Sequence, residues 1–506
     1  MFTSVSSAAV LGLECTPITI EVDISGTWPG FTIVGLPDTA IQEARERIRT
    51  AWKNSGISFP NNSRIIVNLA PADVRKEGSA YDVPIALGMY LSLEKIEIDI
   101  SHMLFVGELA LDGSLRHTTG ILPLAIFAKE HHIQSLFVPS VNAEEATIID
   151  GVTIFPVKNF SSLIKHLKGE ELIKPQPKAD ISSWTKEYVY DMDMSLVKGQ
   201  EFVKRGLEIA ASGAHNILLN GPPGSGKTLL ARTLPSILPK MNTDEMVEVT
   251  KIYSVAGLLP ADQPIITVRP FRSPHHSASG VALVGGGKFP KPGEISLAHR
   301  GVLFLDEFPE FPRIVLENLR QPLEDGLITI SRAQGTLSFP ARFSLVASQN
   351  PCPCGFATDT SRVCSCSPIQ IERYRKKISG PLLDRIDLHV EVPRLDFEKL
   401  TSVETGESSE KIRARVEEAR ERQNKRFREL PIETNAEMKN RELKKFCVIN
   451  DTSIELMRQA VTYMNLSARS YHRILKVART IADLGASDNI ETEHIAEALQ
   501  YRTKIE

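Results

Sequence analysis

A glycine-rich loop between two apolar segments constrains the fold of this chain more than any other feature. Its pattern is a glycine, four residues, a second glycine, a lysine and a Ser or Thr, as in loops that bind nucleotide phosphates. Residues 216–220 before the loop predict a buried strand, and residues 229–234 after it predict the start of a helix. The loop consists of Gly221, Pro222, Pro223, Gly224, Ser225, Gly226, Lys227 and Thr228. A strand, this loop and a helix in succession predict an α/β domain that binds ATP.

The residue types of the loop suit this chemistry. Glycines let backbone N–H groups turn inward onto the phosphates, and a helix N-terminus favours the negative charge that the phosphates carry. We expect Lys227 to reach the β and γ oxygens and the Thr228 hydroxyl to meet Mg²⁺. A bare match can arise by chance in any Gly-rich loop, but the flanking strand and helix favour the nucleotide site.

Two further apolar runs end in polar residues that ATP hydrolysis requires. Residues 301–305 precede Asp306 and Glu307, which we expect to bind Mg²⁺ and to polarise the attacking water, respectively. Residues 343–350 predict a third strand that ends in Asn350, a candidate for orienting that water. An apolar run ending in Asp-Glu is also common where a strand meets a turn, so only the preceding phosphate loop makes the catalytic interpretation preferable.

Composition limits the remaining possibilities. A chain of 506 residues with 42% hydrophobic and 24% charged residues is expected to form two or three soluble globular domains. A net charge of −3 argues against a uniformly basic surface for nucleic acid, so such binding would need local patches. No apolar run is long enough for a membrane span, and the first residues lack the pattern of a signal peptide, which predicts a cytoplasmic protein.

Residues 1–167 predict an α+β domain in front of the ATPase. Alternation predicts strands at 18–24, 64–69, 103–106 and 135–139, while helical spacing predicts helices that begin at Asp38-Thr39 and others at 82–92 and 122–131. Residues 168–192 are polar and contain prolines, which is typical of a linker.

The motifs Lys76 to Val83, Gly107 to Leu109 and Gly120 to Pro123 resemble the proteolytic domain of Lon-type proteases. The resemblance places Ala80 where that family has its nucleophilic serine and Leu122 where it has the partner lysine. A serine-lysine pair needs both groups, so we expect a Lon-like domain without proteolytic activity. A shifted alignment would use Ser79 instead.

Motifs across the second half of the chain extend the resemblance. They are Arg269 to His276, Gly285 to Gly287, Pro292 to Ile295, Ala298 to Arg300, Gln321 to Gly326, Asn350 to Gly355 and Leu382 to Asp387. With the front domain, they make the chain similar over nearly its whole length to the bacterial YifB/ComM group of magnesium-chelatase-like AAA+ ATPases. The resemblance implies a doubly wound α/β core with a helical lid, and ComM members of the group are DNA branch-migration helicases of natural transformation.

Two arginines receive roles from this resemblance. Arg385 corresponds to the arginine finger that reaches the nucleotide of a neighbouring subunit, although an ion pair with Asp384 or Asp387 is the alternative. Ser467-Ala468-Arg469 resembles the start of the sensor-2 helix of the lid, so Arg469 is expected to sense the γ-phosphate, with Arg473 as the alternative. The Lys/Arg-rich run 411–428 is better explained as a solvated helix than as a face that follows DNA.

Four cysteines, Cys352, Cys354, Cys364 and Cys366, form two Cys-x-Cys pairs nine residues apart. Four thiolates can complete a tetrahedral structural Zn²⁺ site, while free cysteines in a loop are the alternative. His275 and His276 can be ligands or DNA contacts, but we expect local hydrogen bonds and assign them no chemistry.

We therefore expect a Lon-like domain at 1–167, a linker at 168–192, an AAA+ core at 193–395 with the four-cysteine insertion at 352–366, and a helical lid at 396–506. The expected function is an ATP-driven DNA remodelling motor that binds single-stranded and branched DNA regardless of sequence, acts as a hexameric ring and uses ATP, Mg²⁺ and structural Zn²⁺. A magnesium-chelatase motor subunit is the main alternative, disfavoured by the front domain and the cysteines. A Lon-like peptidase is a second, disfavoured by Ala80 and Leu122.

Overall fold

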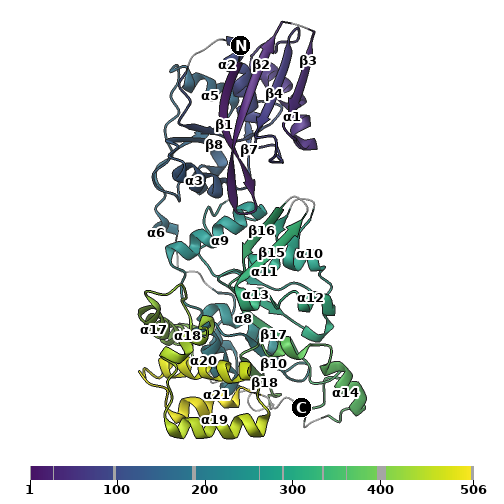
Figure 1. The fold of residues 1–506 in the computed structure, drawn as a ribbon, viewed down its shortest axis with the longest axis vertical. Coiled ribbons are helices and arrows are strands. Elements are labelled where there is room, and N and C mark those ends of the chain that lie inside the picture. Colours follow the sequence, from purple (N-terminus) through teal and green to yellow (C-terminus); the bar gives the residue numbers. More distant parts are fainter. Residues whose placement is uncertain are drawn as a thin grey trace. The chain divides into compact units, whose positions relative to one another are not determined.

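A computed structural model gives the fold (Figure 1) and describes residues 2–26, 28–94, 98–184, 190–260, 262–287, 290–332, 335–359, 362–395 and 406–502. The chain forms two compact units. The first contains Met1–Lys186 together with Thr243–Thr267, and the second contains Glu187–Asn242 and Val268–Glu506. The segment Thr243–Thr267 lies within the range expected for the ATPase core, yet it packs with the front unit.

A four-stranded sheet of order β1-β2-β4-β3 forms one part of the first unit. Its strands are β1 (Phe2–Leu11), β2 (Glu14–Ser25), β3 (Gly30–Val34) and β4 (Arg64–Ala70). Three parallel strands form a second sheet of order β5-β8-β9, namely β5 (Met103–Phe105), β8 (Ser135–Pro139) and β9 (Thr153–Val157). A short hairpin joins β6 (Glu108–Leu109) to β7 (Leu115–Arg116).

The helices of the first unit bury apolar residues against these sheets. Helix α1 (Thr39–Asn54) begins at the Asp38 cap, as the sequence predicts, and buries Ile41, Ala44, Ile48 and Trp52. Helix α2 (Asp82–Glu94) is buried over nearly its whole length. The other helices are α3 (Ile121–Glu130), α4 (Ala143–Ala146), α5 (Phe160–Leu167), α6 (Ile181–Trp184) and α9 (Thr243–Ala256). The strands and helices predicted for this region are confirmed, whereas the strands β1, β3, β6, β7 and β9 and the helices α4, α5, α6 and α9 were not predicted.

The second unit is built on a parallel five-stranded sheet of order β11-β14-β17-β10-β18. The strands are β11 (Phe271–Arg272), β14 (Val302–Leu305), β17 (Ser344–Gln349), β10 (Ile217–Asn220) and β18 (Leu388–Glu391). Its three central strands are almost entirely buried, because helices cover both faces of a parallel sheet. The order is not sequential, so crossovers pass on both sides, and the predicted α/β core with a parallel sheet is confirmed.

Helices and two hairpins surround this sheet. The helices are α7 (Glu201–Gly213), α8 (Lys227–Ile237), α10 (Gly280–Val284), α11 (Glu294–Leu297), α12 (Arg313–Glu317), α13 (Pro322–Asp325), α14 (Pro368–Arg375) and α15 (Gly380–Leu383). The hairpins pair β12 (Gly285–Gly286) with β13 (Lys291–Pro292), and β15 (Leu327–Arg332) with β16 (Gly335–Pro340).

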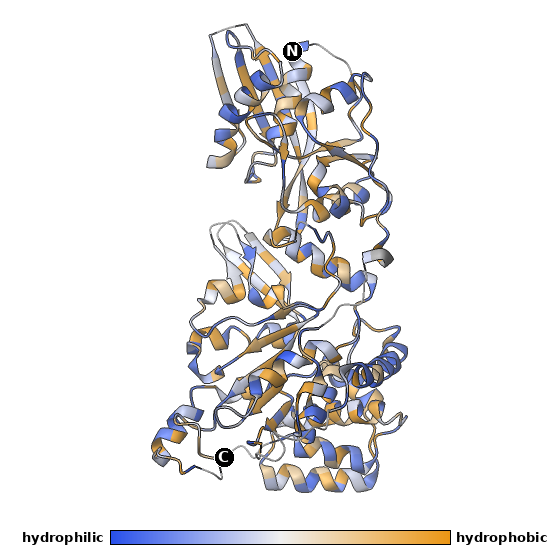
Figure 2. Cartoon of the chain, turned by 180° about the vertical axis from the view of Figure 1, so that it is seen from behind, coloured by the Kyte–Doolittle hydropathy of each residue, from blue (hydrophilic) through white to orange (hydrophobic). Residues whose placement is uncertain are grey.

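The C-terminal part of the second unit is helical. It contains α17 (Ser409–Phe427), α18 (Asn440–Phe446), α19 (Asp451–Met464), α20 (Ala468–Leu484) and α21 (Thr492–Gln500). Ser467 caps α20, which buries the apolar residues Ile474, Leu475, Ala478, Ile481 and Ala482. Figure 2 shows that α17 is largely hydrophilic, in contrast to the central strands. In α17, Arg415 pairs with Glu208 and Arg426 with Asp483, in keeping with the structural interpretation of this basic helix.

Among the helices that the structure describes, none has the length and apolar character to cross a membrane.

Candidate functional site

The glycine-rich loop joins β10 to α8, as the sequence predicts. Gly224 and Gly226 have φ angles of 76° and 88°, which a residue with a side chain adopts only under strain. This conformation turns the loop into the N-terminus of α8, where backbone N–H groups attract anions. The Ser225 hydroxyl is buried and has no hydrogen-bond partner within the described structure. An unsatisfied buried hydroxyl in this loop fits a phosphate acceptor.

Lys227 is the first residue of α8 and its side chain folds back over the loop. Its Nζ donates to the carbonyl oxygens of Gly221 at 2.7 Å and Pro222 at 2.9 Å, and to Asn350 Oδ1 at 3.2 Å. Burial lowers the pKa of Lys227, an effect that the Asp306 carboxylate opposes. The three predicted elements of the site, namely the loop, the end of β14 and the end of β17, therefore meet around one ammonium group.

Asp306 follows β14 and accepts a hydrogen bond from Thr228 Oγ1, at 2.9 Å from Oδ2. The Ser348 hydroxyl and the Glu307 backbone N–H donate to the other carboxylate oxygen. A hydroxyl and a carboxylate oxygen in contact are the hard oxygen ligands that Mg²⁺ prefers. Sequence reasoning missed Ser348, although its position near the end of the neighbouring strand β17 was a usable signal.

Glu307 has a positive φ of 52°, and its side chain is 58% exposed. His276 Nδ1 lies 3.4 Å from Glu307 Oε2. The adjacent His275 bonds locally, with its Nδ1 2.8 Å from Ser277 Oγ. The local hydrogen bond expected for the histidine pair is thus found at His275, whereas His276 contacts the residue expected to activate water.

Arg385 is almost completely buried at the end of α15. It forms an ion pair with Glu324 and donates from Nη1 to the Pro381 carbonyl at 2.8 Å. Neither Asp384 nor Asp387, the two partners considered from the sequence, receives this ion pair. Glu324 was not recognised as a site residue, although it lies in one of the motifs that carry the resemblance.

Arg469 also approaches Glu324, with 3.6 Å between Arg469 Nη2 and Glu324 Oε1. The Arg469 side chain is 53% exposed. Arg473, the alternative sensor, is instead paired with the buried Asp387. The structure therefore brings Arg469 and Arg385 together on one carboxylate and commits Arg473 to a structural pair. Burial alone would raise the pKa of Glu324, but the Arg385 hydrogen bond and the charges of the nearby arginines together outweigh burial and lower it.

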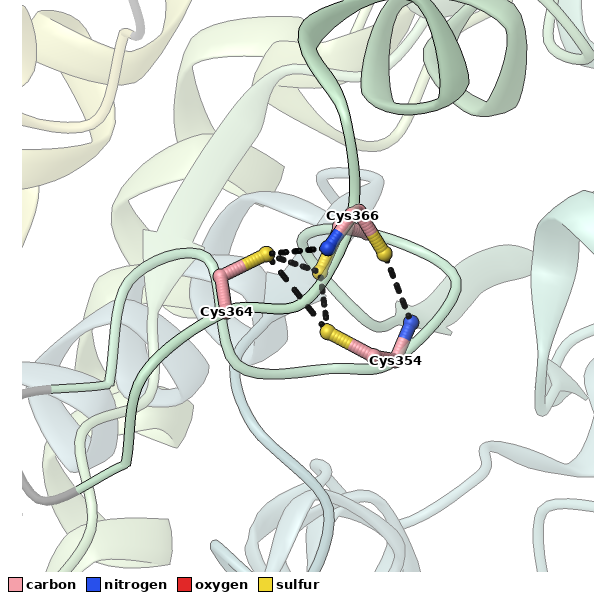
Figure 3. Close-up of side chains that lie close together, drawn as sticks. Cys354, Cys364 and Cys366 are labelled. Carbon is pink, nitrogen blue, oxygen red and sulfur yellow. Dashed lines mark hydrogen bonds between the residues drawn. The ribbon is translucent and has the colours of Figure 1, made fainter.

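The four cysteines of the predicted insertion form one cluster, and Figure 3 shows Cys354, Cys364 and Cys366 brought together from two parts of the loop. All four sulfurs lie within 4.8 Å of one another. The Cys352–Cys354, Cys354–Cys364 and Cys352–Cys364 sulfur separations are 3.4, 3.5 and 3.7 Å. A tetrahedral Zn²⁺ with bonds of about 2.3 Å requires sulfurs about 3.8 Å apart. The three measured separations are compatible with this ion, and the Cys366 sulfur lies within 4.8 Å of the other three.

The ionisation of the thiols also favours a bound cation at this cluster. The backbone N–H of Phe356 lowers the pKa of Cys354 to about 5. At Cys364 the Cys366 N–H favours the thiolate, but burial and the neighbouring Cys354 and Cys352 raise the pKa to about 12. Thiolates this close repel one another, so a bound cation is needed for all four to be deprotonated.

The front unit places no serine-lysine pair at the positions expected from Lon-type proteases. Leu122 is fully buried near the start of α3, and Ala80 occupies the other position. The Ser79 hydroxyl, which the shifted alignment would use, donates to the Glu108 carboxylate. Lys76 is buried and donates to the Pro71 carbonyl.

Comparison with known proteins covers almost the whole chain. Residues 193–400 match the family described as magnesium chelatase, subunit ChlI, residues 406–502 match its C-terminal family, and residues 20–142 match the family described as subunit ChlI of Mg-chelatase.

Individual relatives agree with these family matches. The competence protein ComM of Haemophilus influenzae is 44% identical, with 99% of this chain and 97% of that protein covered. The Escherichia coli protein YifB is 43% identical, with 98% and 96% covered. The magnesium-chelatase 38 kDa subunit of Cereibacter sphaeroides is 26% identical over 31% of this chain and 52% of that protein. This family implies ATPase activity, and the chain belongs to the YifB/ComM family of magnesium-chelatase-like proteins.

Proposed function

We propose that this chain is an ATP-driven DNA remodelling motor of the branch-migration type that acts in recombination during natural transformation. The observation that carries the proposal is an alignment over 99% of the chain with a protein named for competence. A phosphate loop, Asp306, Glu307 and Asn350 at one end of a parallel sheet supply the groups that such a motor needs. The motor works in the cytoplasm, where chromosomal DNA is recombined.

ATP and Mg²⁺ would be held by the loop and its neighbours. The backbone of residues 221–226 would cradle the phosphates, and Lys227 would exchange its carbonyl partners for phosphate oxygens. Thr228 and Asp306 would hold Mg²⁺, which, when bound, neutralises charge on the phosphates. Glu307 would take a proton from the attacking water, which Asn350 would help to orient.

Arg385 would act on the nucleotide of a neighbouring chain in a hexameric ring, and Arg469 would sense the γ-phosphate. Both already lie on one carboxylate, Glu324, so a movement that frees one would free the other. An arginine finger contributes about 10³ to 10⁵ in rate, because it meets charge that develops on the transferred phosphoryl group.

Mixed assemblies test this arrangement. Arg385→Ala and Lys227→Ala chains should each be inactive alone, while their mixture should recover part of the ATPase rate, because a mixed interface can carry both intact residues. Mixed rings without any recovery would show that Arg385 acts within its own chain.

The central experiment measures the ATPase rate with single-stranded, duplex and branched DNA, with Lys227→Ala as the control for contaminating activity. Stimulation is expected, together with DNA binding that weakens with salt by a slope of about −0.7 to −0.9 per phosphate contact. Migration of a branched substrate should require hydrolysable ATP. An equal rate with every DNA form, in protein shown to be assembled, would refute the proposal.

A magnesium-chelatase motor subunit is the second candidate, favoured by the family matches. It is weakened by coverage, because the chelatase subunit aligns with 31% of the chain while ComM aligns with 99%. This candidate predicts ATPase stimulation by a porphyrin-binding partner and no response to DNA.

We further propose that Cys352, Cys354, Cys364 and Cys366 hold one structural Zn²⁺ per chain. Elemental analysis after exhaustive dialysis should find about one Zn²⁺, and replacing Cys352 and Cys366 by Ser should remove it. Zinc-free protein with unchanged stability would contradict the assignment.

A further inference from the structure

The four-cysteine cluster is built directly onto the nucleotide loop. Its first ligand, Cys352, comes two residues after Asn350, whose side chain accepts from Lys227. The backbone of Asn350 also meets the hydroxyl of Tyr374, a buried residue of α14. The chain therefore leaves the nucleotide site at Asn350, forms the cluster, and returns to Asn350 through α14.

A second contact lies inside the cluster itself. Cys352 and Cys354 belong to a tight turn that closes with a hydrogen bond of 3.0 Å from the Gly355 N–H to the Cys352 carbonyl. Gly355 has a φ of +85°, and a Cβ placed on it would lie 2.4 Å from Cδ of Pro223 in the phosphate loop. Only a residue without a side chain can pack this closely. The turn that carries two of the four sulfurs thus packs directly against the phosphate loop.

We infer that metal occupancy of the Cys352–Cys366 cluster controls how tightly this chain binds nucleotide. This inference rests on the proposed zinc site and extends it. With metal bound, four sulfurs fix the turn at Cys352–Gly355, and this turn packs against Pro223 and holds it in place. Without metal, the four sulfurs are no longer held by one ion, so the turn can move and the phosphate loop loses the support that packs against Pro223.

The coupling has to work in both directions. If metal binding tightens nucleotide binding by a given factor, nucleotide must tighten metal binding by the same factor. Couplings between two sites are commonly about 5- to 150-fold. Nucleotide should therefore raise the affinity for zinc in competition with a chelator at equilibrium, a measurement that does not depend on ATP hydrolysis.

The alternative is a cluster that presents a surface to a partner. Val363 is 95% exposed beside Cys364, and Arg362 lies over the Phe356 ring. Such a surface needs no link to the phosphate loop, so the close contact between Gly355 and Pro223 favours the coupled site.

The test uses the full chain in buffer with Mg²⁺ and measures the affinity for a fluorescent ADP analogue before and after zinc removal with a zinc-selective chelator. Affinity should fall about tenfold or more, within the range of such couplings, and return when zinc is restored. The analogue should raise the affinity for zinc, measured at equilibrium by competition with a colorimetric zinc indicator, by the same factor. Nucleotide affinity within twofold of the starting value in zinc-free protein would refute the coupling.

Variants separate the coupling from the zinc site itself. Gly355→Ala should keep its zinc but bind the analogue more weakly, because its Cβ displaces Pro223. Gly169→Ala is the matched control, since Gly169 also has a positive φ, of +74°, but nothing lies within 4 Å of its Cβ position. Cys364→Ser should lose both zinc and affinity.

If zinc is present and Gly355→Ala binds nucleotide normally, the coupling is wrong while the zinc site stands. A parent chain that never contains zinc and binds nucleotide like Cys364→Ser refutes both. If Cys364→Ser does not fold, zinc removal from the parent and the Gly355→Ala variant still decide the question.

Discussion

Replacing Asp387 by Asn should destabilise the second unit strongly, because this carboxylate is the buried anion of a cationic cluster. Asp387 is 3% exposed, forms an ion pair with Arg473, and accepts from the Asn216 N–H at 3.0 Å. Burial alone would raise the pKa of Asp387, but Arg473 and the other nearby cations outweigh burial and hold it far below its usual range. The carboxylate is therefore charged throughout the physiological range.

The magnitude follows from what Asn retains and loses. The Asn amide oxygen can still accept from Asn216, so the loss is the charge. Removing one member of a buried ion pair costs about 3–5 kcal/mol. The Arg473 side chain keeps 17% exposure and is partly hydrated, which favours the lower end of that range. For domains of about 150–250 residues each kcal/mol corresponds to about 2–4 °C, so the midpoint should fall by about 6–12 °C.

Thermal unfolding followed by circular dichroism at pH 7.5 measures this change. Asp384→Asn is the control, since Asp384 accepts long hydrogen bonds of 3.4 Å from Ser467 and Ser470. It should cost less than about 1 kcal/mol, as for most sites outside tightly packed networks. A cost below about 1 kcal/mol for Asp387→Asn as well would refute the assignment of a desolvated charge pair.

The pH dependence provides a second check with a definite sign. A carboxyl whose folded pKa is depressed contributes stability that is fully present above its unfolded pKa of about 3.9. That contribution disappears as the pH falls through the folded value. The difference between parent and Asp387→Asn should therefore be constant above about pH 5 and shrink in more acidic solution.

Three further predictions concern the active site and the front unit. Glu307→Gln should bind the fluorescent ADP analogue normally but lose about 10²- to 10⁴-fold in phosphate release, because a general base is removed; an unchanged rate would exclude Glu307 as the base. His276→Ala should alter the ATPase rate less than about fivefold, since an exposed ion pair contributes at most about 1 kcal/mol; a larger loss would make His276 a positioning residue for Glu307. The parent chain and Ser79→Ala should cleave casein equally little with or without ATP, and cleavage that depends on Ser79 would overturn the non-proteolytic assignment.

Local signals made the nucleotide site predictable from the sequence. The strand, loop and helix around Lys227 are adjacent in the chain, and Asp306 and Asn350 each end an apolar run, so the parallel sheet brings them together. The cysteine cluster was predictable for the same reason, because its spacing suits one metal. The binding of zinc by this cluster stays a prediction.

Contacts between distant residues were not predictable. Glu324 lies 61 residues from Arg385 in the sequence. No local pattern indicates that this carboxylate contacts both Arg385 and Arg469. His276 meets Glu307 only because β11 and β14 are neighbours in the sheet. The packing of Gly355 on Pro223 depends on a loop conformation that the metal-ligand spacing does not specify.

The position of α9 determines how the two units of this protein can be produced separately. The Ser254 hydroxyl donates to the buried Glu145, and the Gly120 N–H donates to the Ser254 carbonyl, so α9 is part of the front unit. Removing residues 1–186 alone would therefore leave α9 without the residues on which it packs. Surfaces that are normally covered would become exposed.

The second unit can be isolated by removing α9 as well. Arg269 Nε donates to the Pro239 carbonyl at 2.6 Å, and so ties together the two places where the chain departs for α9 and returns. Because these ends lie side by side, residues 243–267 can be excised together with residues 1–186 and replaced by a short glycine-rich bridge. A minimal ATPase therefore needs both deletions. The front unit consists of an N-terminal part, residues 1–186, and a segment inserted into the second unit, residues 243–267.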